Sequence, residues 1–416
     1  MKILVIGGGG REHALIWKIA QSPRLTRLYC APGNAGMASL SESVPIPVDD
    51  IDALLRFAEE KKIDLTVVGP ELPLSLGIVD RFEAKGLRIF GPHRGAAEIE
   101  TSKVFSKSLM QKYRIPTPEA EIVSLEEAYG KIPSIEMPIV LKVEGLAAGK
   151  GVVIAKDREE AKEALNSFRT LGKAASRIIL EQYLEGVEAT FFILTDGLTV
   201  VPLASAQDHK RVFDADRGPN TGGMGAISPT PRITSSIERD VMSRIIYPVL
   251  EGLAAEGRPY RGVLYAGLML TPSGPYVLEF NARWGDPEAQ AVLPRLKTDW
   301  VDLMEATLDH RLNQTRMEWN EAVSVCVVLA SEGYPGDYRK GEIISGLETV
   351  RPEEALVFHA GTERKGERWL THGGRVLGVT AFGKDFSEAR RHVYQAITRI
   401  SFPGMHFRKD IGASAS

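Results

Sequence analysis

The two side chains in this sequence best suited to chemistry are a carboxylate and an amide on one predicted strand. Glu279 and Asn281 stand two residues apart in the run Tyr276–Arg283, so they project from the same side of a strand, roughly 7 Å apart. Hard oxygen ligands in this arrangement suit Mg²⁺ that bridges ATP phosphates, with water in the remaining positions. Arg283 falls on the same face, where its guanidinium can stabilise a phosphoryl group in transfer.

A solvent-facing strand is the alternative interpretation of this run. Leu278 and Phe280 are expected on the opposite face, and a dense loop follows the strand, so a partly buried strand is the better prediction. The preceding run, Gly262–Leu270, is predicted to pair with it as the first strand of an antiparallel hairpin, because Pro272, Ser273 and Gly274 supply a turn between them.

A glycine-rich segment, Gly145–Gly151, lies between two apolar runs that we predict to be strands. It is not a P-loop, because only three residues separate its glycines, Gly151 stands where Ser or Thr is required, and a strand follows in place of a helix. A glycine hairpin can instead fold over a triphosphate, with the backbone of Gly149 and the ammonium of Lys150 meeting phosphate oxygens. The alternative is a β-hairpin with a surface lysine.

Charged residues at two strand ends also need an explanation. Burying the Lys142 ammonium without a partner costs on the order of several kcal/mol, so it is expected to meet an anion. The apolar run Ser176–Leu180 ends at Glu181, and Glu188 follows. A purine slot between two domains requires such a pattern, because backbone groups can bind the adenine edge and a later carboxylate can accept from ribose hydroxyls. Taken alone, however, this pattern favours a solvated strand end.

The glycines Gly7–Gly10 follow the first predicted strand and open a helix, so their amides can meet a phosphate or another small anion. A dinucleotide fold is disfavoured for two reasons. Glu12 occupies the position of the third glycine, and the second strand ends in Ala31–Asn34 without an acid to bind a ribose. A tight structural turn is the remaining alternative.

Composition places limits on the class of protein. The chain has 416 residues, of which 44% are hydrophobic and 25% charged, as in an ordinary globular protein of two to four domains. A net charge of −3 provides no electrostatic footprint for nucleic acid or an anionic membrane. No apolar stretch approaches the roughly 18 residues that span a bilayer. Cys30 and Cys326 are expected to be buried free thiols in a reducing compartment, so we expect a cytoplasmic location.

The elements that must position these side chains follow from the hydrophobic pattern. Strand and helix patterns alternate in the first hundred residues and predict an α/β domain with a parallel sheet covered on both faces. The expected strands are Lys2–Ile6, Leu28–Ala31, Leu65–Val68 and Arg88–Phe90, separated by helices near Glu12–Gln21, Ile51–Lys61 and Gly77–Lys85. A helix at Lys103–Tyr113 and a stiff connector at Ile115–Pro118 lead into a small α+β unit over about 120–190. Short strands from about Val323 onward predict a β-rich end.

Together these segments resemble the ATP-grasp superfamily and, more narrowly, the glycinamide ribonucleotide synthetase family, nearly from end to end. Two stretches that are specific to that family carry most of the resemblance, Gly218–Gly225 and Arg283–Gln290. Five more widely shared ones support it: Leu4–Ala14, Gly145–Gly151, Asp208–Arg211, Gly333–Tyr338 and Phe407–Gly412. The resemblance implies an α/β chain with an amino-terminal parallel-sheet (Rossmann-like) domain at 1–101, an ATP-grasp domain at 102–312 with a mobile lid at about 120–190, and a carboxy-terminal β-rich domain at 313–416.

The resemblance also implies an activity and a set of roles. The family joins glycine to 5-phosphoribosylamine in purine biosynthesis, by way of glycyl phosphate, and it works without nucleic acid or membrane; we expect a monomer. ATP is expected to contact Lys103, Lys142, Gly149, Lys150, Glu181, Leu184 and Glu188, while Glu279 and Asn281 hold Mg²⁺ or Mn²⁺. Lys142 and Arg283 are the expected catalytic cations. The expected substrate residues are Gly9, Gly10, Asp208, Lys210, Asn220, Thr221 and Arg283.

Three departures from the pattern stand out. The strand Leu264–Leu270 carries no acid, where many ATP-grasp enzymes have one, so fewer protein ligands hold the metal. Phe213 replaces a small residue, and Trp284 replaces Phe or Leu. Two alternative functions remain open. One is an ATP-grasp ligase with another acid or amine, and the other is a nucleotide-sensing or dehydrogenase-type protein that binds NAD.

Overall fold

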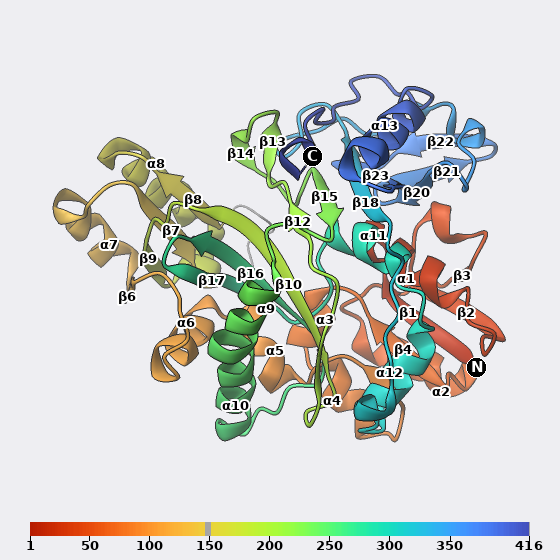
Figure 1. The fold of residues 1–416 in the computed structure, drawn as a ribbon, viewed down its shortest axis with the longest axis horizontal. Coiled ribbons are helices and arrows are strands. Elements are labelled where there is room, and N and C mark those ends of the chain that lie inside the picture. Colours follow the sequence, from red (N-terminus) through yellow and green to blue (C-terminus); the bar gives the residue numbers. More distant parts are fainter. Residues whose placement is uncertain (146–150, 416) are drawn as a thin grey trace.

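The computed structural model describes residues 1–145 and 151–415. Its first hundred residues form a parallel sheet in the order β3-β2-β1-β4-β5, flanked by helices (Figure 1). The central strand β1 is buried along almost its whole length, as expected for a parallel sheet covered on both faces. The elements are β1 (Lys2–Gly7), α1 (Gly10–Ile19), β2 (Arg27–Pro32), β3 (Glu42–Ser43), α2 (Ile51–Lys61), β4 (Leu65–Val68), α3 (Glu71–Ser75), α4 (Ile78–Glu83), β5 (Ile89–Phe90) and α5 (Arg94–Thr101).

Two helices of this domain, α3 and α5, were not predicted from the sequence. A single helix was predicted near Gly77–Lys85, whereas the structure has α4 there and the short helix α3 before it. Pro73 lies in the first turn of α3, where its missing amide costs no intrahelical hydrogen bond. Pro73 therefore does not prevent this helix, and α3 carries Glu71 toward the site described below.

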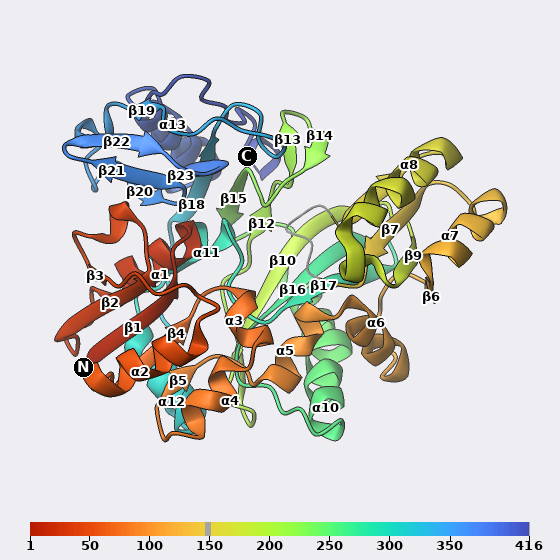
Figure 2. The ribbon, with the colours of Figure 1, turned by 180° about the vertical axis from the view of Figure 1, so that it is seen from behind.

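A separate small unit, here called the lid, follows the first domain and projects to one side of the molecule (Figures 1 and 2). Its sheet has the order β6-β9-β7-β8, and its own hydrophobic core includes Leu141, Phe168 and Ile178. The connector Arg114–Glu119 joins it to α6, which packs on the central part of the chain. The elements are α6 (Lys103–Lys112), β6 (Ala120–Val123), α7 (Leu125–Lys131), β7 (Ile139–Val143), β8 (Val152–Ala155), α8 (Arg158–Phe168) and β9 (Ile178–Gln182).

The central part of the chain, here called the body, contains the antiparallel sheet β11-β10-β16-β17. The hairpin β16–β17 is the one predicted from the sequence, but it has a register shift between Gly267 and Leu268 that leaves Leu278 without a direct partner. The elements are β10 (Val187–Thr195), β11 (Val200–Pro202), α9 (Ser235–Val241), α10 (Tyr247–Ala255), β16 (Gly262–Thr271), β17 (Gly274–Asn281), α11 (Glu288–Val292) and α12 (Trp300–Leu308).

The carboxy-terminal sheet is not built from the last hundred residues alone. Its order is β12-β15-β18-β23-β20, so β15 pairs with β18, which begins at Val323, and β12 extends the sheet by pairing with β15. A hydrophobic core over β18 and β23 is covered by α13. The elements are β12 (Gln207–Asp208), β13 (Arg211–Phe213), β14 (Arg217–Asn220), β15 (Gly225–Ser228), β18 (Val323–Ala330), β19 (Ile343–Ile344), β20 (Leu356–His359), β21 (Thr362–Lys365), β22 (Arg368–Thr371), β23 (Arg375–Gly383) and α13 (Phe386–Ile397).

Two smaller expectations can be compared with this fold. Both cysteines are buried and free, as predicted. None of the helices in the described parts of the chain is long and apolar enough to cross a membrane.

Two buried histidines join the first and last domains. The amide of His359 on β20 donates to Nδ1 of His13 on α1, over 2.8 Å. Burial lowers the pKa of His13 to about 3, with a further contribution from His359, and burial lowers the pKa of His359 to about 4. Both rings are therefore neutral in the folded protein at neutral pH.

This pair predicts a loss of stability in mild acid. As pH falls below about 6.5, the unfolded chain takes up protons that the folded chain refuses, so each histidine lowers the free energy of unfolding by about 1.4 kcal/mol per pH unit. The loss continues until pH approaches the folded pKa values. Urea unfolding between pH 5 and pH 7.5 should show a smaller pH dependence for His13→Asn than for wild type. His310→Asn, at an exposed position, is the control, and equal slopes in all three proteins would contradict the assignment.

Candidate functional site

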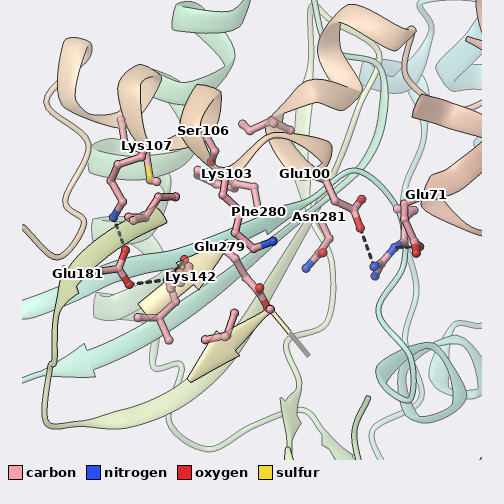
Figure 3. A pocket seen from close by; sticks show the side chains of 17 residues that line it. Glu71, Glu100, Lys103, Ser106, Lys107, Lys142, Glu181, Glu279, Phe280 and Asn281 are labelled. Carbon is pink, nitrogen blue, oxygen red and sulfur yellow. Dashed lines mark hydrogen bonds and ion pairs between the residues drawn. The ribbon is translucent and has the colours of Figure 1, made fainter. Parts of the chain in front are cut away.

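A cavity of about 230 Å³ lies between the lid, α5, α6 and β17. Figure 3 shows that side chains from all four regions converge on it. Six residues predicted from the sequence line this one cavity: Lys103, Lys142, Glu181, Glu279, Asn281 and Arg283. The other lining residues are Glu71, Ile99, Glu100, Ser106, Lys107, Met110, Gly151, Val152, Ile179, Leu278 and Phe280.

A buried carboxylate between two lysines forms the lid side of the cavity. Glu181 Oε1 lies 2.5 Å from Lys142 Nζ, and its Oε2 lies 2.6 Å from Lys107 Nζ (Figure 3). The Glu181 side chain is 1% exposed, so the interpretation of this position as a solvated strand end is wrong. The predicted need of Lys142 for an anionic partner is met within the protein. Lys142 also donates to the carbonyl of Leu278, over 3.1 Å.

The opposite side of the cavity carries the predicted metal ligands. Glu279 and Asn281 both line the cavity from β17, as their spacing predicted. The expectation that Leu278 and Phe280 lie on the opposite face is wrong, because both line the cavity too. A register shift beside Leu278 interrupts the alternation of the strand. Burial alone would raise the pKa of Glu279, but Lys210, Lys142 and other nearby cations lower it overall. The Glu279 carboxylate is therefore ionised at neutral pH.

Two acids hold Arg283 in place at one end of the cavity. Glu100 Oε1 lies 2.6 Å from Nη2 of Arg283, and Glu71 Oε2 lies 3.4 Å from its Nε (Figure 3). Glu100 also accepts from the amide of Ala282, over 2.7 Å, which fixes the backbone next to the arginine. Burial would lower the pKa of Arg283, but Glu100 and Glu71 raise it overall. The guanidinium thus stays charged and fixed in orientation.

Lys103 lines the cavity from α6. Its ammonium donates to the carbonyl of Gly145 over 3.3 Å, at the point where the glycine-rich segment begins. Burial lowers the pKa of Lys103, against the opposing effect of Glu279. Gly149 and Lys150, assigned to phosphate from the sequence, lie outside the described residues.

A cluster of four acids around one lysine adjoins the cavity. Lys210 Nζ lies 2.9 Å from Glu188 Oε2 and 3.6 Å from Glu279 Oε1. Burial raises the pKa of Asp208 well above its ordinary value, and Glu288, Glu188 and Glu279 add to the effect while Lys210 opposes it. Burial likewise raises the pKa of Glu288, whose Oε1 accepts from Thr190 over 3.3 Å. The cluster has more acids than bases.

The hairpin that carries Asn220 and Thr221 is held closely by its neighbours. Both the amide and the hydroxyl of Thr221 donate to the carbonyl of Lys210, over 2.8 and 2.7 Å. Asn220 pairs with Arg211 across β13 and β14. Phe213 is half exposed, and its ring meets that of His406 edge-on at 5.6 Å. In this structure the hairpin is therefore bound to the carboxy-terminal segment and to Lys210.

The amino-terminal glycines have partners within the protein. The amide of Gly9 donates to Glu12 Oε2 over 2.7 Å, so an anion at this amide would have to displace a carboxylate. A Cβ at position 10 would meet Gln290 Nε2 at 2.5 Å, so a larger residue there would displace the end of the Gln290 side chain on α11. Gln290 in turn donates to Asp286, over 2.8 Å. The assignment of these glycines to a substrate phosphate stays a prediction.

The structure also identifies residues that the sequence analysis did not assign. Lys107 follows Lys103 by four residues on α6, and this spacing places two lysines on one face of a helix. The i, i+4 pattern could have revealed it. Glu71, Glu100 and Glu288 gave no such signal, because their partners lie far away in the sequence. Leu184 and Glu188 lie outside the cavity wall, and Glu188 is connected to it through Lys210.

Comparison with known proteins assigns all three parts of this architecture to one family. Family models described as the N domain, the ATP-grasp (A) domain and the C domain of phosphoribosylglycinamide synthetase match residues 1–100, 101–289 and 324–414. A phosphoribosylamine–glycine ligase of Caldanaerobacter subterraneus is 50% identical over 417 residues, covering 99% of this chain and 100% of that protein.

Solved structures agree with these matches. A phosphoribosylamine–glycine ligase of Thermotoga maritima is 33% identical and superposes with a TM-score of 0.84, covering 99% of this chain and 100% of that one. The biotin carboxylase domain of a Hydrogenobacter thermophilus 2-oxoglutarate carboxylase, solved with MgADP and bicarbonate, is 18% identical, with a TM-score of 0.74 over 98% of this chain and 91% of that one, and shows the fold alone. The chain belongs to the phosphoribosylglycinamide synthetase family, whose central domain has the ATP-grasp fold.

Proposed function

We propose that this chain is a carbon–nitrogen ligase that joins glycine to 5-phosphoribosylamine, with the conversion of ATP to ADP and phosphate. The observation that carries the proposal is the single cavity in which two oxygen ligands, several cations and a fixed guanidinium converge. The names of its full-length relatives supply the two substrates. The N, ATP-grasp and C domains of this family all match the chain, which supports the reaction that the relatives' names describe.

The cavity is proposed to hold the phosphates of ATP. Lys103 and Lys142 contact them. Gly149 and Lys150, which lie outside the described residues, are assigned to them from the sequence alone. Glu181, Leu184 and Glu188 surround the nucleoside. Glu279 and Asn281 fit a divalent cation, because they are hard oxygen donors on one cavity wall; the described residues contain no group of three His, Cys, Asp or Glu that would favour another metal site. A bound Mg²⁺ or Mn²⁺ would neutralise charge on the phosphates.

The proposed reaction changes a poor leaving group into a good one. A carboxylate oxygen of glycine attacks the terminal phosphorus of ATP, the bond to the bridging oxygen breaks, and ADP leaves. The amine of phosphoribosylamine then attacks the carbonyl carbon of glycyl phosphate, phosphate leaves, and the nitrogen loses a proton. Because no protein nucleophile is needed, the contributions of Lys142 and Arg283 are positioning and charge stabilisation.

The acidic cluster next to the cavity is the proposed binding site for a substrate amino group. Asp208 and Glu288 lie beside Lys210 and Glu279, and an excess of carboxylates attracts an amino group. Asn220 and Thr221 are held next to Lys210 by the hairpin. The glycine amine or the amine of the sugar phosphate is the proposed ligand there, and Gly9 and Gly10 remain the proposed site of the sugar phosphate.

A phosphate-release assay tests the proposal. The protein should release phosphate and ADP only when glycine, phosphoribosylamine and ATP are all present with Mg²⁺, and alanine should not replace glycine. Release that is independent of phosphoribosylamine, or equal with alanine, would assign the chain to another ATP-grasp ligase. Binding of NAD without ADP formation would overturn the proposal altogether.

A further inference from the structure

Lys107 lies where the body, the connector and the lid meet. It follows Lys103 by one turn of α6, and its side chain is 3% exposed. Its Nζ donates to the hydroxyl of Thr117 over 2.6 Å and to the carbonyl of Pro118 over 3.2 Å, both in the connector. The third partner is Glu181 on the lid strand β9, at 2.6 Å.

The ammonium donates hydrogen bonds to two of these partners and forms an ion pair with the third, Glu181. A lysine ammonium carries three hydrogens, and three acceptor atoms lie within 3.2 Å of Lys107 Nζ. Lys107 is therefore not available to bind a phosphate directly. Within the part of the chain that the structure describes, Lys142 has two such partners, Glu181 and the carbonyl of Leu278, and retains a donor for the cavity.

Glu181 divides its carboxylate between the two lysines. One oxygen pairs with Lys142 and the other with Lys107, and Figure 3 shows the carboxylate between them at one end of the cavity. Without the Lys107 ammonium, both carboxylate oxygens could pair with Lys142 and withdraw its remaining donor. A buried carboxylate with a single cation would also lose part of its stabilisation.

The connector is itself hydrogen-bonded to β17. The Thr117 hydroxyl donates to the carbonyl of Val277 over 2.9 Å, and the amide of Val277 donates to Pro116 over 2.8 Å. Val277 lies on β17, two residues before Glu279. Lys107 thus connects the lid strand that carries Glu181 to the strand that carries the proposed metal ligands.

We propose that Lys107 is a positioning residue for nucleotide binding: it holds Glu181 so that Lys142 keeps a donor directed at the phosphates. The inference rests on the proposed function, in which this cavity holds ATP. It predicts an effect on ATP and not on glycine, because none of the three partners of Lys107 belongs to the acidic cluster around Lys210.

Steady-state kinetics with ATP as the varied substrate test this role. Lys107→Met and Lys107→Gln should raise the KM for ATP about tenfold while kcat and the KM for glycine stay within about twofold, the pattern of lost ground-state binding. Lys107→Arg, which keeps the charge, should restore most of the affinity. Lys112→Met is the matched control, because Lys112 lies on the same helix and its side chain is 64% exposed.

The possible outcomes distinguish a positioning role of Lys107 from a purely structural role. They also distinguish failure of this inference from failure of the proposed function. A lowered melting temperature with an unchanged KM for ATP would mean that Lys107 only stabilises the fold, and the inference would be wrong. Lys107→Gln keeps a polar side chain with N–H donors but removes the charge, so it decides the question if Lys107→Met does not fold. A wild-type protein that forms no ADP would instead contradict the proposed function, independently of any variant.

Discussion

Replacing Glu279 by alanine should lower ADP formation by at least about a hundredfold, comparable to the loss of one preorganised charge-stabilising group in an active site. The variant removes the only carboxylate of the proposed metal pair and leaves Lys103, Lys142 and Lys210 without their shared anion. The fold should persist, because the Glu279 side chain is 39% exposed and contributes little apolar packing. Turnover at saturating ATP and Mg²⁺ is the measurement.

Two comparisons make this prediction specific to the metal site. Glu321→Ala removes an exposed carboxylate far from the cavity wall and should leave turnover unchanged. Raising the Mn²⁺ concentration should recover part of the activity of Glu279→Ala if Asn281 still provides a ligand. Wild-type turnover in a folded Glu279→Ala protein would show that Glu279 does not hold the cation.

Arg283→Lys should lower kcat by about a hundredfold with a small change in the KM for ATP, since the loss falls mainly on the transition state. Lysine keeps the positive charge that Glu100 and Glu71 require, so the buried acids are not left unpaired. It does not keep the planar fork that can contact two phosphoryl oxygens at once. Separate measurement of kcat and KM distinguishes a lost transition-state contact from a lost binding contact.

The matched control for this variant is Arg244→Lys. Arg244 pairs with Asp240 one helical turn away and is half exposed, so its replacement should change neither parameter. A kcat for Arg283→Lys within about twofold of wild type would remove Arg283 from the reaction. Arg283 would then be a structural link between Glu100, Glu71 and the backbone of Trp284.

Elements with clear hydrophobic spacing and capping residues were predicted correctly from the sequence. The strand at Leu65–Val68 and the helix at Ile51–Lys61 have the predicted bounds, because Asp50 caps that helix and its apolar residues recur at helical spacing. The spacing of Glu279 and Asn281 likewise placed both on one wall of the cavity.

Other features depend on contacts between distant segments, and no local pattern encodes them. The register shift beside Leu278 places it in the cavity wall, against the expected alternation. In the sequence, Glu181 looks like an ordinary strand end. Its carboxylate is buried because it pairs with Lys142 and Lys107, which lie 39 and 74 residues earlier in the chain. The pairing of β15 with β18 joins segments about a hundred residues apart, so no local pattern indicated a sheet shared between the two regions.

The most direct measurement is a crystal structure of the protein with Mn²⁺ and a non-hydrolysable ATP analogue. The anomalous signal of manganese should lie between the phosphate oxygens and the side chains of Glu279 and Asn281, with Lys142 in contact with the phosphates and Glu181 still between Lys142 and Lys107. A manganese ion bound elsewhere, or phosphates distant from Glu279 and Asn281, would contradict the proposal that this cavity transfers a phosphoryl group.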